Sequence, residues 1–272
     1  MKNSIVITGA SGSMGSEAVR AMAAKGWPVI MACRNLEKGE AVRQTILREL
    51  PQAELRLQKL DIGSFESVRQ FAGSLGEMRL AGLFNCAGVI SRSFGISPDG
   101  YENTMAVNCV GPMLLTGLLL PQIEDGGHIV NMVSLTSKLA HIDENLFVPC
   151  GETHFNRLKV YSRSKLALVL YTLELAEKCP GLHVNMADPG IVDSNMISMG
   201  KWFDPLADLL FRPFCKSPAS GVAPAVRALE AEVTGKYFVG GRIADLPPRI
   251  VQHPLRDLVW EESRKTATSS GR

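Results

Sequence analysis

Near its N-terminus the chain reads Ser4-Ile5-Val6-Ile7-Thr8-Gly9-Ala10-Ser11-Gly12-Ser13-Met14-Gly15, an apolar run followed by a glycine-rich turn. The apolar run predicts a buried strand, and residues 13–25 have the amphipathic pattern of a helix. Glycines let the backbone turn sharply and approach a pyrophosphate, while the helix that follows directs free N–H groups at the anion. A tight strand-to-helix connection would also use glycines, but the position directly after the first strand favours a dinucleotide site.

The same alternation of strand and helix continues along the chain. Further strands are predicted at 28–33, 55–60, 80–85, 128–133, 182–187 and 237–239. Helices are predicted from the second strand to about residue 50 and at 64–75, 100–120, 158–178 and 219–231. Short apolar strands that alternate with helices are typical of a parallel sheet covered on both faces. We therefore expect an α/β fold with a doubly wound parallel sheet, a Rossmann fold, as a single domain over residues 1–265 and a disordered tail over 266–272.

Composition narrows the choice of partners. The 272 residues carry a formal net charge of +2, which gives no electrostatic reason to expect nucleic acid or an anionic membrane. The six cysteines form neither a Cys-x-x-Cys pair nor a zinc spacing, so no metal site is expected. The sequence shows no apolar signal segment and no run that approaches the length of a membrane span. These features predict a cytoplasmic protein with reduced thiols.

Catalytic chemistry is indicated by Tyr161-Ser162-Arg163-Ser164-Lys165, which follows a strand ending at Ser134. A spacing of four places Tyr161 and Lys165 on one face of a helix. Reduction of a carbonyl needs a hydride donor, a proton donor for the developing alkoxide and a dipole that orients the oxygen. A free phenol titrates near 10, so Tyr161 needs roughly 3 units, or about 4 kcal/mol, of anion stabilisation to work near neutrality, much of which Lys165 can supply. Ser134 would orient the substrate oxygen.

The end of the second strand indicates which nicotinamide dinucleotide is used. An acidic residue there binds the ribose hydroxyls of NAD, whereas an arginine accommodates the 2′-phosphate of NADP. This chain has Cys33-Arg34-Asn35 at that point, with Lys38 one helical turn further on. Arg34 therefore predicts NADP (NADPH) in preference to NAD, with Lys38 as a helper. Asp61, just after the third strand, could cap the next helix or contact the adenine.

Seven motifs, in order, resemble those of the short-chain dehydrogenase/reductase family over nearly the whole chain. They are the Thr8–Gly15 turn, Asp61-Ile62, Asn85-Cys86-Ala87-Gly88, Asn108, the Ile129–Ser134 strand, Tyr161-x-x-x-Lys165, and Pro189-Gly190-Ile191-Val192-Asp193-Ser194. Ala32-Cys33-Arg34-Asn35 and the long spacer between Ser134 and Tyr161 most resemble the retinol dehydrogenase-like branch, which acts on retinoids, steroids and other lipophilic carbonyls. The resemblance implies an oxidoreductase that interconverts a carbonyl and an alcohol on a lipophilic substrate.

The resemblance also assigns roles to residues. The catalytic residues would be Ser134, Tyr161, Lys165, which also bonds the nicotinamide ribose, and Asn108, which holds a water that relays protons to Lys165. Cofactor contacts would come from Gly9, Ser11, Gly12, Ser13, Met14, Gly15, Arg34, Asn35, Lys38, Asp61, Ile62, Asn85, Ala87, Gly88, Tyr161, Lys165, Pro189, Gly190, Val192 and Ser194. The chain departs from the usual pattern in one charge, because Asp188 precedes Pro189 where a neutral or basic residue is usual.

Two other functions remain open. The spacing Gly9-x-x-Gly12-x-x-Gly15 resembles that of sugar-nucleotide epimerases and dehydratases, although their larger C-terminal substrate domain has no counterpart here. A non-catalytic NADP-sensing protein would tend to lose the tyrosine or the lysine, and both are present.

The apolar, proline-broken stretch 196–214 predicts a substrate lid near residues 191–218, but packing on the core or on a partner subunit would give the same pattern. The resemblance implies a homodimer or homotetramer, and apolar residues in the helices at 104–120 and 160–176 agree with this as well as with core packing.

Overall fold

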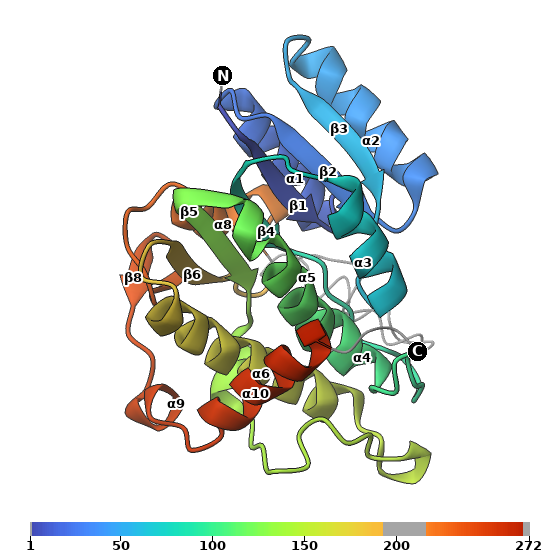
Figure 1. The fold of residues 1–272 in the computed structure, drawn as a ribbon, viewed down its shortest axis with the longest axis vertical. Helices are drawn as coiled ribbons and strands as arrows, with labels where there is room; N and C mark the ends of the chain where they lie inside the picture. The colour runs from blue at the N-terminus through green and yellow to red at the C-terminus, as the bar shows by residue number, and fades with distance from the viewer. Residues whose placement is uncertain (1, 193–215, 269–272) are drawn as a thin grey trace.

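A computed structural model describes residues 2–192 and 216–268 of the chain (Figure 1). Within these residues eight strands form one sheet in the order β3-β2-β1-β4-β5-β6-β7-β8. The strands are β1 (Ser4–Thr8), β2 (Val29–Cys33), β3 (Leu55–Lys59), β4 (Leu80–Asn85), β5 (Ile123–Met132), β6 (His183–Asp188), β7 (Tyr237–Val239) and β8 (Arg242–Ala244). All pairs are parallel except β7 with β8. The predicted doubly wound α/β sheet is confirmed.

Helices cover both faces of this sheet (Figure 1). They are α1 (Ser13–Ala24), α2 (Leu36–Glu49), α3 (Phe65–Ser74), α4 (Asn103–Met105), α5 (Gly111–Leu119), α6 (Arg157–Lys178), α8 (Pro218–Ala228), α9 (Pro248–Val251) and α10 (Arg256–Thr268). One hydrophobic core joins the sheet to α3, α5, α6 and α10, and a second joins it to α1, α2 and α8. Burial on both faces explains why the central strands read as continuous apolar runs.

The crossover directions bring the carboxyl ends of β1, β4, β5 and β6 to one edge of the sheet. In register, Val6 of β1 lies beside Ile30 of β2 and Leu83 of β4, and Phe84 of β4 lies beside Val130 of β5. Because each of these strands is followed by a turn at the same edge, residues far apart in the sequence meet there.

The C-terminal helix α10 was not predicted, and it packs across α5 and α6 (Figure 1). Trp260 stacks on Tyr171 of α6, with ring centres 6.2 Å apart and planes 19° apart, and Arg256 pairs with Glu174 at 2.7 Å. The disordered tail was predicted from Thr266, but α10 continues to Thr268 and Thr266 is buried. Residues 269–272 lie outside the described part of the chain.

The helix predicted at 100–120 consists of α4, a π-helical turn, η1 (Ala106–Val110), and α5. The helix therefore continues through Gly111 and Pro112, which lie in the first turn of α5. A Cβ at Gly111 would lie 1.9 Å from Ile62 O, so only glycine fits this contact. The stretch Asn103–Gln122 is long and apolar enough to span a membrane by length and composition, so the prediction that no run approaches that length is wrong. It is 72% buried, as expected of the core helix of a sheet protein.

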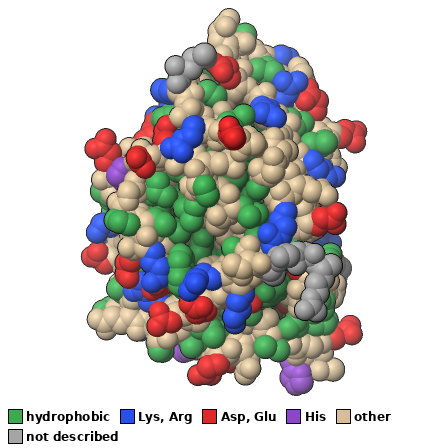
Figure 2. All heavy atoms as spheres, in the orientation of Figure 1, with side chains coloured by type: hydrophobic (Ala, Val, Ile, Leu, Met, Phe, Trp, Pro, Cys, Tyr) green, Lys and Arg blue, Asp and Glu red, His purple; other side chains and the backbone are tan. Residues whose placement is uncertain are grey.

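The surface seen in Figure 2 carries charged side chains of both signs around an apolar central area. This mixture agrees with the small net charge of +2. The predicted lid segment 196–214 and Ser194 lie outside the described residues.

Candidate active site

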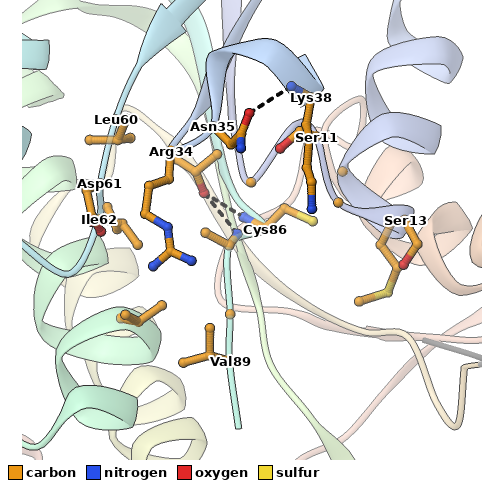
Figure 3. A pocket seen from close by; sticks show the side chains of 18 residues that line it. Ser11, Ser13, Arg34, Asn35, Lys38, Leu60, Asp61, Ile62, Cys86 and Val89 are labelled. Carbon is orange, nitrogen blue, oxygen red and sulfur yellow. Dashed lines mark hydrogen bonds between the residues drawn. The ribbon is translucent and has the colours of Figure 1, made fainter. Parts of the chain in front are cut away.

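A cavity of about 600 Å³ opens at the carboxyl ends of β1, β2 and β4 (Figure 3). It collects thirteen of the residues predicted to contact a cofactor: Gly9, Ser11, Gly12, Ser13, Met14, Gly15, Arg34, Asn35, Lys38, Asp61, Ile62, Ala87 and Gly88. Five lining residues were not predicted: Thr8, Leu60, Cys86, Val89 and Val107. Leu60, Ile62 and Val107 give one end of the cavity an apolar wall of the kind that suits a flat base.

The glycine-rich turn is held by close backbone contacts. Gly9 has a φ of 66°, and a Cβ there would lie 2.9 Å from the Cα of Ala87. A Cβ at Gly15 would lie only 2.1 Å from Gly9 O, so the start of α1 packs directly on the turn. The backbone hydrogen bond from Gly12 N to Gly9 O, at 2.9 Å, closes the turn. These contacts require the glycines that the sequence places here.

The N-terminus of α1 suits an anionic ligand. Its N-cap, Gly12, provides no side-chain hydrogen bond, and its first turn contains no acidic residue. By contrast, Asn35 caps α2, Ser64 caps α3 and Asn156 caps α6 through their side chains. An uncapped helix start beside a glycine turn is the arrangement that binds phosphate. The residues present therefore fit a dinucleotide pyrophosphate.

Thr8 connects the glycine turn to the neighbouring strand. Its hydroxyl accepts hydrogen bonds from Cys86 N and Ala87 N, both at 3.0 Å, as the dashed lines in Figure 3 show. This bridge fixes the end of β4 against the end of β1. Thr8 had been quoted only as the start of the turn, and the signal that could have identified it is a buried hydroxyl at the last position of the first strand.

Basic side chains lie at the β2 end of the cavity. Arg34 and Lys38 both extend toward it in Figure 3, and among the described residues neither forms an ion pair. Asn35 accepts a hydrogen bond from Lys38 N at 2.8 Å, so its side-chain oxygen serves as the cap of α2. Asp61 accepts from Gly63 N at 3.1 Å and does not cap α3, which Ser64 caps instead.

Tyr161, Lys165 and Ser134 come together as the spacing predicted. The ammonium nitrogen of Lys165 lies 6.0 Å from the centre of the Tyr161 ring and donates to Met132 O at 2.7 Å. The hydroxyl of Ser134 accepts from Thr136 N at 3.3 Å, and it acts on the phenol of Tyr161, whose pKa it lowers. A Cβ at Gly88, which lines the cavity, would lie 3.6 Å from Lys165 Nζ, so Lys165 adjoins the cavity.

Burial controls the protonation of this group. It raises the pKa of Tyr161, an effect that the Ser134 hydrogen bond opposes and the charge of Asp188 reinforces. Burial also lowers the pKa of Lys165 to about 8, and Cys86, Cys109 and Asp188 oppose this change. The sequence argument had Lys165 lowering the pKa of Tyr161. In the structure burial raises the pKa of Tyr161, and Lys165 is not among the groups that lower it.

Asn108 joins Val89, which lines the cavity, to Ser164 of α6. Its Oδ1 accepts from Val89 N at 2.8 Å, and its Nδ2 donates to Val89 O at 2.9 Å and to Ser164 Oγ at 3.1 Å. Ser164 Oγ in turn donates to Tyr161 O at 2.8 Å. The π-helical turn of η1 places Asn108 for these contacts, and its role in holding a water stays a prediction.

Asn85, which was predicted to contact the cofactor, is not among the residues that line the cavity. It is 1% exposed and donates to Thr116 Oγ1 at 3.0 Å and to Asn131 Oδ1 at 2.8 Å. Asn131 continues this polar network to Thr172 of α6 at 2.9 Å. The side chain of Asn85 therefore joins β4 and β5 to the helices behind them, because buried amides need partners.

The turn after β6 carries three more predicted cofactor contacts, Pro189, Gly190 and Val192, which are not among the residues that line the cavity. Gly190 has a φ of 73°, and its N–H donates to Asp188 Oδ1 at 2.7 Å. Pro189 is buried, and Val192 packs against Gly221 of α8. Ser194 is outside the described residues. Within the described residues no group of three or more His, Cys, Asp or Glu could hold a metal ion.

Comparison with known proteins identifies the class. A family model for short chain dehydrogenase matches residues 3–201. The chain is 33% identical to bovine retinol dehydrogenase 12 over 268 residues, which cover 95% of this chain and 84% of the relative. It is 30% identical to human retinol dehydrogenase 13 over 276 residues, covering 96% and 83%. The chain therefore belongs to the short-chain dehydrogenase/reductase family, and within that family it is similar to retinol dehydrogenases.

Solved structures agree with the fold. A protein from Mycobacterium paratuberculosis superimposes with a TM-score of 0.80 at 24% identity, covering 99% of this chain and 94% of that one. A short chain dehydrogenase from Shigella flexneri, complexed with NADP, gives a TM-score of 0.68 at 23% identity, covering 89% and 98%. Family and relatives together make this protein an oxidoreductase that acts on CH–OH groups.

Proposed function

We propose that this protein is an NADP-dependent oxidoreductase that interconverts a carbonyl and a primary or secondary alcohol on a lipophilic substrate, with Tyr161 as general acid/base. The observation that carries the proposal is the junction at Gly88, where the dinucleotide cavity meets Lys165. A Cβ at Gly88 would lie 3.6 Å from Lys165 Nζ and 3.3 Å from Asn108 Oδ1. The proton-transfer group and the cofactor site therefore adjoin.

The chemistry follows from this junction. When bound, the reduced nicotinamide supplies a hydride to the carbonyl carbon. Tyr161 donates its phenolic proton to the carbonyl oxygen as negative charge develops there. Ser134, hydrogen-bonded to the phenol, orients the same oxygen. Lys165 stabilises the phenolate that forms, because a nearby cation favours the ionised phenol. In the oxidation direction the same groups act in reverse.

NADP is favoured by the charges at the β2 end of the cavity. Arg34 and Lys38 line it, and Glu37, the acidic residue in the first turn of α2, does not. Two cations without an ion-pair partner in the described part of the chain suit a 2′-phosphate, which arginine binds through paired hydrogen bonds. The similar short chain dehydrogenase from Shigella flexneri is complexed with NADP, which supports this choice.

A lipophilic substrate is favoured by exposed apolar side chains that follow Ser134, precede Tyr161 or follow β6 in the sequence. Leu135 and Leu139, on the 3₁₀ helix η3 (Leu135–Leu139) that follows Ser134, are 52% and 76% exposed. Leu158, three residues before Tyr161 on the same helix, is 61% exposed, and Ile191, after the β6 turn, is 65% exposed. Large apolar side chains that gather at one site commonly mark a place of binding. The retinol dehydrogenase relatives lead in the same direction.

Location and assembly remain predictions. The cytoplasmic location was inferred from the sequence. The apolar residues of α5 and α6 were compatible with a homodimer or homotetramer and equally with core packing, and α10 packs over both helices. Association through that face would therefore have to displace α10 or include it.

One experiment separates the proposed function from its alternatives. NADPH and NADH are titrated by fluorescence, and turnover is then measured with steroid, retinoid and small aromatic ketones and with nucleotide sugars. The proposal expects tighter binding of NADPH and turnover that is faster on large apolar carbonyls. Turnover of nucleotide sugars alone would favour an epimerase or dehydratase, and binding without turnover would favour an NADP sensor. The matched variants Leu139→Ala and Val148→Ala, both at exposed apolar sites, test whether the apolar side chains that follow Ser134 bind the substrate. Only Leu139→Ala should raise KM for large ketones.

A further inference from the structure

The last residue of β6, Asp188, is a fully buried carboxyl group with an unusual set of partners. Its Oδ1 accepts from Gly190 N at 2.7 Å, and its Oδ2 accepts from the hydroxyl of Tyr237 on β7. Both oxygens act as acceptors, which is the pattern of an ionised carboxylate. The first bond shapes the turn after β6, and the second ties that turn to the neighbouring strand.

The charge of Asp188 has no cation paired with it in the described residues. Lys138 lies on the other side of Tyr237, with its ammonium nitrogen 4.2 Å from the ring centre, and Lys216 lies beside Gly190. Neither forms a salt bridge with Asp188. A buried carboxylate held only by neutral donors is costly, because hydrogen bonds replace only part of its lost hydration.

The turn by itself does not require this charge. An asparagine at 188 could accept from Gly190 N through its oxygen and donate to the Tyr237 hydroxyl through its amide. It would shape the same turn without burying an ion. The negative charge therefore calls for an explanation beyond the local backbone.

Asp188 lies close to the catalytic group in the sheet, because it follows Ala187, which pairs with Met132 of β5, and Met132 O accepts from Lys165 Nζ at 2.7 Å. After burial and the Ser134 hydrogen bond, Asp188 is the next influence on the pKa of Tyr161, which it raises. It also opposes the lowering of the Lys165 pKa that burial causes. Lys165 in turn lies beside Gly88 at the end of the dinucleotide cavity. A cationic group that bound at this junction would feel both the repulsion of Lys165 and the attraction of Asp188.

The nicotinamide changes its charge in the reaction, being neutral when reduced and positive when oxidised. We propose that Asp188 is a positioning residue whose buried carboxylate stabilises the oxidised, cationic nicotinamide over the neutral reduced form. This inference rests on the proposed function. Its consequence is that the equilibrium on the protein, in which carbonyl, NADPH and a proton give alcohol and NADP⁺, is displaced toward the alcohol.

The test is equilibrium binding without substrate. Dissociation constants for NADP⁺ and NADPH are measured by calorimetry for the wild type and for Asp188→Asn. The affinity for NADP⁺ should fall on the order of tenfold more than that for NADPH, the scale of two unit charges about 12 Å apart at an effective dielectric constant of about 20. Asp188→Ser replaces the asparagine variant if the latter does not fold.

Tyr237→Phe is the matched control. It removes the hydroxyl that donates to Asp188 but leaves the carboxylate, so the thermal midpoint should fall while the ratio of the two dissociation constants stays near that of the wild type. If the ratio of the two dissociation constants were unchanged in Asp188→Asn, and the thermal midpoint fell in both variants, Asp188 would have a structural role only. If the wild type bound neither dinucleotide, the proposed function itself would be overturned. If the wild type bound both and Asp188→Asn had the same ratio of dissociation constants, only this inference would be overturned.

Discussion

Lys165 and Tyr161 share one face of α6, with the lysine ammonium 6.0 Å from the centre of the tyrosine ring and hydrogen-bonded to Met132 O at 2.7 Å. The lysine is thus anchored at the carboxyl end of β5, and the tyrosine is held by Ser134 beyond the end of the same strand. One strand therefore positions both ends of the proton-transfer pair.

Tyr161→Phe should keep NADPH affinity and lose roughly 2–4 orders of magnitude in turnover, which is the scale of positioned acid–base catalysis. The matched control is Tyr101→Phe, since the Tyr101 hydroxyl bonds to Glu262 at 2.6 Å away from the cavity. Steady-state kinetics and fluorescence titration measure the two effects. Near-normal turnover in Tyr161→Phe would exclude this residue as the acid.

Carbonyl reduction should depend on pH through Lys165. Burial lowers its pKa to about 8, so the ammonium is present below that pH and is lost as pH rises through it. Tyr161, whose pKa burial raises, keeps its proton over the same interval. The value of kcat/KM for reduction should therefore be level below about 8 and fall above it, because this ratio reports the free enzyme. Lys165→Arg should move the fall to higher pH, and a profile that is flat to pH 10 in the wild type would contradict the assignment.

Gly15→Ala should abolish dinucleotide binding and destabilise the protein, because the added Cβ would lie 2.1 Å from Gly9 O. Gly73→Ala provides the control, since Gly73 lies in α3 with nothing within 4 Å of a Cβ there. That variant should gain about 0.5–1 kcal/mol of stability from higher helix propensity. Thermal melts with and without NADPH distinguish the two. Normal NADPH binding by Gly15→Ala would show that the turn is not the pyrophosphate site.

Arg34→Asp should shift the cofactor preference from NADP toward NAD. It removes a charge-assisted contact to the 2′-phosphate and adds an acceptor for ribose hydroxyls. The ratio of kcat/KM for NADPH over NADH should fall on the order of tenfold to hundredfold, which corresponds to one hydrogen bond to a charged group. Arg48→Asp, at the far end of α2, should leave the ratio unchanged. If Arg34→Asp also left it unchanged, Lys38 or Ser13 would be the next candidate.

The strands and most helices could be predicted because their signal is local. Buried parallel strands must be apolar on both faces, so β1, β2 and β4 stand out in the sequence. β5 begins five residues before its predicted start, at Ile123, because Glu124-Asp125-Gly126-Gly127 interrupts the apolar pattern. Those residues join the sheet through neighbours that the sequence pattern does not reveal.

The C-terminal helix and some side-chain orientations depend on distant partners. α10 is polar over most of its length, and its place is fixed by Tyr171 and Glu174, which contact Trp260 and Arg256 from more than 80 positions earlier. The motif around Asn85 was correctly located, but the direction of its side chain is set by Thr116 and Asn131. Spacing within one helix, as for Tyr161 and Lys165, can be predicted from sequence, whereas contacts between elements cannot.

The central claim is that this protein transfers hydride between NADP and a lipophilic carbonyl with Tyr161 as the proton donor. The most direct test uses NADPH deuterated at both C4 positions, with a bulky apolar ketone or aldehyde, and mass spectrometry of the alcohol formed. The account predicts one deuterium on the carbinol carbon with the wild type and almost none in the same time with Tyr161→Phe. An alcohol that carried no deuterium, or no alcohol at all from a wild type shown to bind NADPH, would contradict it.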